Sequence, residues 1–172
     1  MNGEIFFTLP LLILVFGCGA GGVTVKEGEK APDFVMPSQD GNFVRFSDFR
    51  GRQNVVLYFY PKDDTPGCTK EACSFRDNIS LFRELGTEIL GVSVDDVGSH
   101  KEFQNKYKLN FTLLADPEKH VTKLYGAKTW YGLADRVTFV IDKEGVIRKI
   151  FPDVDVNHHS EELLAFIRSL TQ

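Results

Sequence analysis

The chain has 172 residues, of which 42% are hydrophobic and 26% are charged, a composition typical of one folded domain rather than of a disordered segment. Its formal net charge is −4, and the sequence has no basic stripe with interleaved aromatic residues. Because a phosphate backbone is bound through clustered positive charge, these features exclude nucleic acid as an expected partner.

The amino-terminal segment differs in kind from the rest of the chain. IFFTLPLLILVF, residues 5–16, is short for a bilayer span but has the length of the hydrophobic region of an export signal. The run ends in VFGC, residues 15–18, followed by small residues, and this resembles the lipobox of bacterial lipoproteins. Two features depart from that pattern, the bulky Phe16 and the lack of Lys or Arg in the first four residues.

We therefore expect residues 1–22 to be a signal peptide or lipoprotein leader, and residues 23–172 to form the folded domain. A lipid on Cys18 would attach the exported protein to a membrane on its periplasmic side. The alternatives are an uncleaved anchor, a spurious leader and a cytoplasmic protein.

The folded part opens with short alternating segments. Between residues 25 and 47, strand-like pieces alternate with turns, and Asp40-Gly41 is a hairpin signal. NVVLYFY, residues 54–60, is rich in β-branched and aromatic residues and predicts a buried central strand. After a turn rich in proline and aspartate, apolar residues at three-to-four spacing predict a helix over about 68–85.

The remaining elements alternate between strands and helices and end in a second hairpin and a helix. They are expected as a core strand at 88–94, a helix at 99–107, a short strand at 111–115, a helix at 117–125 that has Pro117 in its first turn, hairpin strands at 137–142 and 145–151, and a closing helix from Ser160. This order predicts an α/β fold with a mixed central sheet flanked by helices. It is the arrangement of the thioredoxin fold, here with an N-terminal β-hairpin extension.

Cys68 and Cys73 are the only cysteines after residue 18. Small secreted domains that rely on disulfides carry four to eight cysteines, so this isolated pair is predicted to be chemical rather than structural. In the thioredoxin fold the reactive sulfur lies after the first central strand, at the amino end of the next helix, and Cys68 occupies that place. Free amide groups and the helix dipole there stabilise a thiolate.

Two further side chains can complete a site for peroxide chemistry. Thr65 can donate a hydrogen bond to the sulfur or to a substrate oxygen, and Arg136, at the start of a core strand, can supply fixed positive charge. A thiolate that attacks a hydroperoxide takes one oxygen and becomes a sulfenic acid, while the donors stabilise charge on the other oxygen. This chemistry needs no metal and no other cofactor.

These residues carry a resemblance to a known family. Pro61, Thr65 and Cys68 match the P-x-x-x-T-x-x-C signature of peroxiredoxins. The longer stretch FYPKDDTPGCTKEACSFRD resembles the peroxiredoxin Q group, also called bacterioferritin comigratory protein. The resemblance extends from about Gly28 to the carboxyl end and includes GEKAPDF, LGVSVD and RVTFVID.

The resemblance implies a hydroperoxide substrate, a thioredoxin or similar dithiol reductant, and a monomer. It also implies a role for each matching residue: Cys68 as the peroxidatic nucleophile, Cys73 as the resolving thiol, Thr65 and Arg136 as groups that orient the peroxide and activate the thiolate, and Pro61 and Gly67 as residues beside the substrate. Most members of the group are cytoplasmic, whereas this chain has an apolar leader.

The spacing of the cysteine pair has a geometric consequence. If both residues are helical, five steps at a rise of about 1.5 Å place their Cα atoms roughly 8 to 9 Å apart. A disulfide tolerates at most about 7 Å. We therefore predict that at least the first turn of the helix unwinds after Cys68 is oxidised.

Several polar residues are expected to have structural roles only. Asp63 and Asp64 are interpreted as solvated turn residues, and His100 and His120 as solvated helix residues. His158 and His159 are adjacent and lack a spaced ligand, so no metal site is predicted. Trp130 and Tyr131 are expected to line the peroxide entrance, to form a partner surface, or to pack.

Two other functions remain as alternatives. The same fold would serve an exported thiol-disulfide oxidoreductase, although such enzymes favour two residues between their cysteines and this pair is separated by four. The second alternative is a holdase or adhesive surface module without enzymatic activity.

Overall fold

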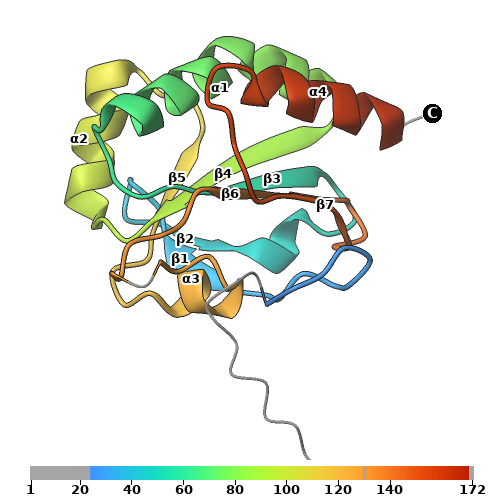
Figure 1. Cartoon of the computed structure of the whole chain (residues 1–172), viewed down its shortest axis with the longest axis horizontal. Helices are drawn as coiled ribbons and strands as arrows, with labels where there is room; N and C mark the ends of the chain where they lie inside the picture. The colour runs from blue at the N-terminus through green and yellow to red at the C-terminus, as the bar shows by residue number, and fades with distance from the viewer. Residues whose placement is uncertain (1–23, 130, 171–172) are drawn as a thin grey trace, which may run out of the picture.

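The computed structural model describes residues 24–129 and 131–170, shown in colour in Figure 1. The expected leader, residues 1–22, together with Cys18 and Trp130, lies outside the described residues, so the predictions about them stay predictions. Within the described ranges, no helix is both long enough and apolar enough to cross a bilayer.

A five-stranded mixed sheet forms the centre of the fold, with strand order β5-β4-β3-β6-β7. Its strands are β3 (Asn54–Phe59), β4 (Thr87–Ser93), β5 (Thr112–Ala115), β6 (Val137–Ile141) and β7 (Ile147–Phe151). β3 pairs in parallel with β4, and β4 with β5, whereas β6 runs antiparallel to both β3 and β7. The predicted thioredoxin-like α/β fold is confirmed.

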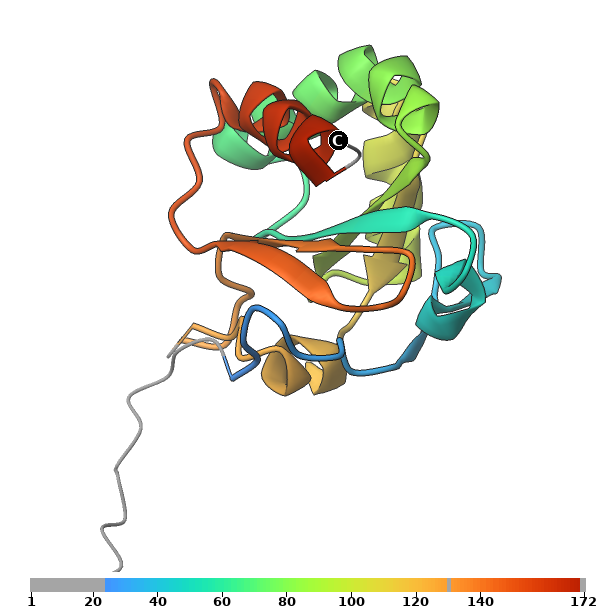
Figure 2. The same cartoon turned by 90° about the vertical axis from the view of Figure 1, so that its right-hand side faces the viewer.

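Helices and a small hairpin cover the two faces of this sheet (Figures 1 and 2). On one face lie α1 (Pro66–Glu84), α2 (Val97–Tyr107) and α4 (His159–Leu170). On the other lie the short helix α3 (His120–Leu124), the 3-10 turn η1 (Phe46–Phe49) and the predicted hairpin of β1 (Val35–Pro37) and β2 (Phe43–Arg45). Figure 2 shows the sheet between these two layers.

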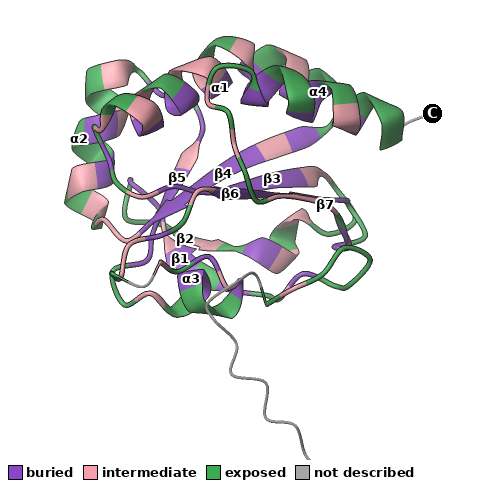
Figure 3. Ribbon diagram, in the orientation of Figure 1, coloured by how far each residue is buried: buried purple, intermediate pink, exposed green. Residues whose placement is uncertain are grey.

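The central strand β3 supplies side chains to both layers of the core, which explains its continuous apolar sequence. Leu57 and Phe59 pack with residues of α3 and the hairpin, and Val56 and Tyr58 pack with residues of α1 and α4. All four are at most 1% exposed, and Figure 3 shows the strand as mostly buried, since every residue of β3 after Asn54 is buried. A strand buried on both faces has no solvent side, so it lacks the polar alternation of a surface strand.

All four helices begin at different residues from those predicted, α2 at Val97 rather than Ser99 and α4 at His159 rather than Ser160. α1 starts at Pro66 rather than near Cys68, because proline lacks an amide hydrogen and is favoured at the first helical position. α3 starts at His120 rather than at Pro117, because residues 116–119 form a turn in which Lys119 adopts φ 60°. The Asp116 side chain then accepts the amide hydrogens of His120 and Thr122 and so caps the short helix.

Candidate active site

Cys68 is placed by the connection between the central strand and the first long helix. β3 ends at Phe59, the loop of residues 60–65 follows, and α1 begins at Pro66, so that Cys68 is the third helical residue. The first α-helical hydrogen bond runs from the Thr69 amide to the Thr65 carbonyl, at 2.8 Å. The amide of Cys68 therefore belongs to the unpaired first turn, where the helix dipole favours negative charge. The thiol is 2% exposed.

Arg136 reaches this thiol from the neighbouring strand. β6 runs antiparallel to β3 with Val137 opposite Phe59, so the residue before β6 lies at the end of β3 where α1 begins. The Arg136 Nη2 group donates to Cys68 Sγ at 3.2 Å. A side-chain carbon at Gly67 would lie 3.4 Å from the same Nη2, an ordinary contact distance, so Gly67 lies beside the guanidinium. The structure brings Arg136, Gly67 and Cys68 together, and their predicted roles stay predictions.

Glu71 is a member of the site that the sequence interpretation missed. It lies one turn after Cys68 on α1, is 1% exposed, and accepts a hydrogen bond at Oε2 from Arg136 Nη1. Its other oxygen, Oε1, has no hydrogen-bond partner among the described residues. Burial raises the pKa of Glu71 to about 7, although Arg136 opposes the shift. The signal for this residue was an acid in the buried stripe of an amphipathic helix.

Glu71 keeps the Arg136 guanidinium protonated and fixes its position. Burial lowers the pKa of Arg136, but the charges and hydrogen bonds of Glu71 and Cys68 outweigh burial and raise it above its ordinary value. A guanidinium that donates to both a carboxylate and a sulfur has little freedom to rotate away. The arrangement keeps a fixed positive charge against the sulfur.

Replacing Glu71 with glutamine should change how stability depends on pH. Because burial raises the Glu71 pKa from 4.5 to about 7, the folded state binds this proton more tightly than the unfolded chain does. Stability from Glu71 is therefore full below pH 4.5 and is lost as the pH rises through about 7. Between pH 5 and pH 8, wild type should lose about 3 kcal/mol of unfolding free energy relative to Glu71→Gln.

Urea denaturation of both proteins under reducing conditions measures this difference. The difference between the two pH profiles of stability reports the ionisation of the Glu71 carboxyl group, because glutamine has nearly the same size as glutamate. Parallel pH profiles for the two proteins would show that Glu71 has an ordinary pKa.

Thr65 and Pro61 lie in the loop before α1, but the structure does not place the Thr65 hydroxyl on the sulfur. Thr65 is the N-cap residue of α1, and its side chain makes no capping hydrogen bond. Its Oγ1 donates to the Lys62 carbonyl at 3.1 Å instead. Pro61 is partly buried. Both residues belong to the loop that leads into the helical turn of Cys68, and their predicted catalytic roles stay predictions.

Cys73 lies in the same continuous helix as Cys68, and both cysteines are free thiols. Cys73 is partly buried, whereas Cys68 is buried. Around them, α1 is tied to α4 and to the segment just before it: Lys70 Nζ donates to Asn157 Oδ1, and the Ser74 and Ser160 hydroxyl oxygens are 2.6 Å apart. The helical premise of the predicted unwinding is therefore met.

Two residues that were interpreted as solvated are buried. Asp63 is 6% exposed and His100 is 0% exposed, and the two are hydrogen-bonded at 2.8 Å. Turn composition and a lone histidine in a helix predict exposure, but the fold brings the loop and α2 into contact and encloses both. Asp64 and His120 are exposed, as expected.

The structure places the two adjacent histidines and Tyr131 as follows. His158 is exposed, whereas His159 is buried and lies 2.8 Å from the Thr138 hydroxyl. Residues 24–129 and 131–170 contain no group of three side chains able to hold a metal ion. Tyr131 is 60% exposed.

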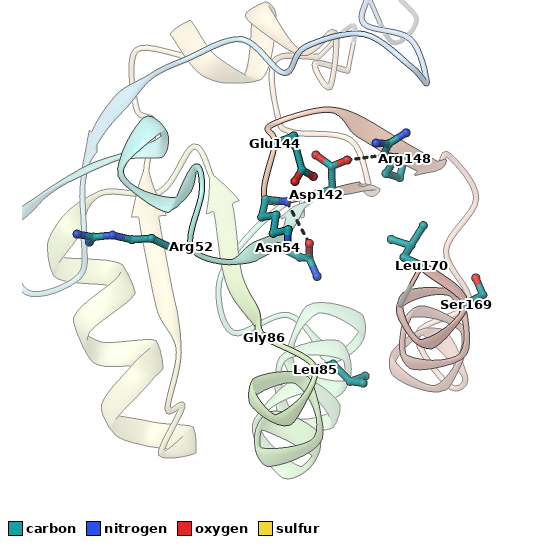
Figure 4. Close-up of a pocket in the computed structure, with 10 residues that line it drawn as sticks. Arg52, Asn54, Leu85, Gly86, Asp142, Glu144, Arg148, Ser169 and Leu170 are labelled. Carbon is teal, nitrogen blue, oxygen red and sulfur yellow. Dashed lines mark hydrogen bonds and ion pairs between the residues drawn. The ribbon is translucent and has the colours of Figure 1, made fainter. Parts of the chain in front are cut away.

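A cavity of about 750 Å³ lies at the other end of the sheet (Figure 4). Its lining includes Asn54 at the start of β3, Gly86 before β4 and Asp142 after β6, whereas Cys68 follows the end of β3. Asp142 is already paired with Arg148. None of the predicted site residues lines this cavity.

Comparison with known proteins gives consistent matches over most of the chain. The AhpC/TSA family profile matches residues 27–150. A Coxiella burnetii protein named "Putative peroxiredoxin bcp" is 44% identical over 150 residues, which cover 83% of this chain and 98% of that protein. The chloroplastic peroxiredoxin Q of Oryza sativa subsp. japonica is 47% identical over 149 residues, 85% of this chain and 68% of that protein. Among solved structures, the C47S mutant of Xylella fastidiosa PrxQ superimposes with a TM-score of 0.82 at 29% identity, and the match covers 88% of this chain and 100% of that chain.

Proposed function

Because this chain belongs to the AhpC/TSA family and is a peroxiredoxin, a thiol-dependent peroxidase, we propose that it reduces hydrogen peroxide and organic hydroperoxides through Cys68. The observation that carries the assignment of the nucleophile is the 3.2 Å hydrogen bond from Arg136 to the Cys68 sulfur in the first turn of α1. A cation and an unpaired helix end together favour the thiolate, which is the form that attacks an O–O bond.

In the first step, the Cys68 thiolate attacks one oxygen of the hydroperoxide. The S–O bond forms as the O–O bond breaks, so that sulfur is oxidised to a sulfenic acid and the peroxide is reduced. The second oxygen leaves with the electron pair and takes up a proton, giving water or an alcohol. Arg136 and the Thr65 hydroxyl, after the latter turns from Lys62, are the donors for the charge on that oxygen.

In the second step, the Cys73 thiol attacks the sulfenic acid and forms a disulfide with loss of water. Both cysteines lie in α1, where residues five apart have Cα atoms roughly 8 to 9 Å apart, beyond the reach of a disulfide. The start of α1 therefore unwinds before this bond closes. A dithiol such as thioredoxin then reduces the disulfide by exchange, which restores both thiols and oxidises the reductant.

The location of the protein is a proposal from its amino-terminal sequence. The apolar run at residues 5–16 and VFGC support removal of the leader and a lipid on Cys18. The folded domain, residues 23–172, would then act as a monomer at the periplasmic face of a membrane, and its reductant would be a thioredoxin-like protein of that compartment.

Mass spectrometry of the full-length protein, purified from its natural source and treated with one equivalent of hydrogen peroxide, tests the proposed function. We expect consumption of the peroxide and one new linkage between the peptides that contain Cys68 and Cys73. The same spectra report the true amino terminus and any lipid on Cys18. Peroxide that persists, or oxidation that spares Cys68, would overturn the proposal.

A further inference from the structure

The loop of residues 60–65 is attached to α2 by two adjacent aspartates, although it belongs to the connection between β3 and α1. Asp63 contacts the first turns of α2, and Asp64 contacts its last turn. The loop carries both Pro61 and Thr65 and leads directly into the turn that holds Cys68. How firmly it is held decides where these groups lie relative to the sulfur.

Asp63 is the buried attachment. Its Oδ1 accepts from the Tyr60 hydroxyl at 2.7 Å, and its Oδ2 accepts from the Ser99 hydroxyl at 2.7 Å and faces His100 Nδ1 at 2.8 Å. Its backbone amide donates to Asp95 Oδ2 at 2.8 Å. Burial raises the pKa of Asp63, but these hydrogen bonds, first those of His100, outweigh burial and lower it below its usual value. Asp63 is thus an ionised carboxylate inside the protein.

His100 is fully buried, and both of its ring nitrogens face acceptors. Nδ1 faces the Asp63 carboxylate, and Nε2 lies 3.1 Å from the Leu114 carbonyl oxygen on β5. A carbonyl can only accept, so the contact with Leu114 needs a hydrogen on Nε2. Through its two ring nitrogens, His100 forms a buried link between the Asp63 carboxylate of the loop, α2 and β5.

Asp64 makes the second attachment, which is exposed. Its carboxylate accepts from Lys106 Nζ and from the Tyr107 hydroxyl, each at 2.6 Å. Exposed ion pairs contribute little because water and salt screen them, whereas breaking a buried pair leaves an uncompensated charge. Because Asp63 is buried and Asp64 is exposed, loss of Asp63 should disturb the loop far more than loss of Asp64. Asp64 is therefore a matched control for Asp63.

We propose that Asp63 and His100 are positioning residues for peroxide reduction, which fix the 60–65 loop so that Pro61 and Thr65 frame the Cys68 sulfur for a hydroperoxide. This rests on the proposed function of Cys68. The pair does not touch the sulfur, and it acts through the loop. Its removal should impair the step that needs the aligned donors and should spare reactions that need only a thiolate.

Two rates measured at Cys68 separate positioning from folding. The first is the second-order rate constant for hydrogen peroxide, and the second is the rate of alkylation by iodoacetamide, followed by mass spectrometry of the Cys68 peptide. Asp63→Asn should lower the peroxide rate about 100-fold, as misplacement by about 1 Å does, and leave alkylation within about twofold. Asp64→Asn should change neither rate by more than about twofold.

A double-mutant cycle tests whether Asp63 and His100 act as one unit. His100→Asn alone, and Asp63→Asn combined with His100→Asn, should lower the peroxide rate by about the same factor as Asp63→Asn alone. If the two single variants' losses in the peroxide rate multiply in the double variant, Asp63 and His100 act independently, and the single-unit model is wrong. If Asp63→Asn does not fold, Tyr60→Phe removes one of the three hydrogen bonds to the carboxylate and should lower the peroxide rate about fivefold, again without slowing alkylation.

The outcomes distinguish this inference from the proposed function. Wild type that does not consume peroxide overturns the proposed function itself. Active wild type with an unchanged peroxide rate in Asp63→Asn, or in Tyr60→Phe where that variant replaces it, overturns the positioning role alone. Equal losses in the peroxide and alkylation rates show a merely structural role, and they overturn the inference as well.

Discussion

Replacing Cys68 with serine should abolish peroxide reduction, with a loss of at least about 1000-fold in the second-order rate constant. A serine hydroxyl stays protonated near neutral pH and, unlike the thiolate, does not attack an O–O bond. The side chain is 2% exposed and similar in size to cysteine, so the fold should remain. Stopped-flow mixing with hydrogen peroxide measures the rate, and circular dichroism measures the fold.

Cys73→Ser is the matched control for this variant. It removes the partly buried thiol of the same helix and leaves the nucleophile. We expect one rapid turnover that stops at the sulfenic acid, because the resolving thiol is missing. Undiminished peroxide consumption by Cys68→Ser, in a folded protein, would refute the assignment of Cys68 as the nucleophile.

Replacing Arg136 with glutamine should lower the peroxide rate constant by about 100- to 1000-fold. The guanidinium donates to the sulfur at 3.2 Å and supplies the charge that favours the thiolate. The variant also leaves Glu71 buried without its cation, which should cost about 3 kcal/mol of unfolding free energy when the carboxyl is ionised. The cost should be smaller at pH 5, where a carboxyl with a pKa of about 7 is protonated.

The double variant Arg136→Gln with Glu71→Gln separates these two effects. It removes both charges, so stability should return toward that of wild type at pH 8 while the peroxide rate stays low. Urea denaturation and stopped-flow kinetics on the same preparations give both values. Recovery of the peroxide rate along with stability would mean that Arg136 acts on the fold rather than on the sulfur.

The thioredoxin-like fold could be predicted from the sequence because its strong patterns are local. NVVLYFY is apolar enough to identify β3, and the alternation of strands and helices leaves few arrangements for the sheet. The start of α3 could not be predicted, because the Asp116 side chain caps the helix from beyond the turn. A pattern of hydrophobic spacing does not show which carboxylate accepts which amide.

The site residues that stand in a short sequence motif could be predicted. The site residues that depend on a partner from another part of the chain could not. Pro61, Thr65 and Cys68 stand in one short signature, whereas Glu71 and Asp63 depend on partners far along the chain, Arg136 and His100. A charged residue is expected at the surface until its partner is known. The residues missed were buried carboxylates and the buried histidine, because only the folded chain shows their partners.

The hydrogen bonds that join α1 to α4 and to the segment just before it have a consequence for turnover. Unwinding that lets Cys73 reach Cys68 would separate Lys70 from Asn157 and Ser74 from Ser160. The oxidised enzyme would then lack these contacts, and re-forming them would favour return of the dithiol. If the proposed disulfide forms, loss of these contacts in the oxidised protein would make that disulfide a stronger oxidant toward its electron donor.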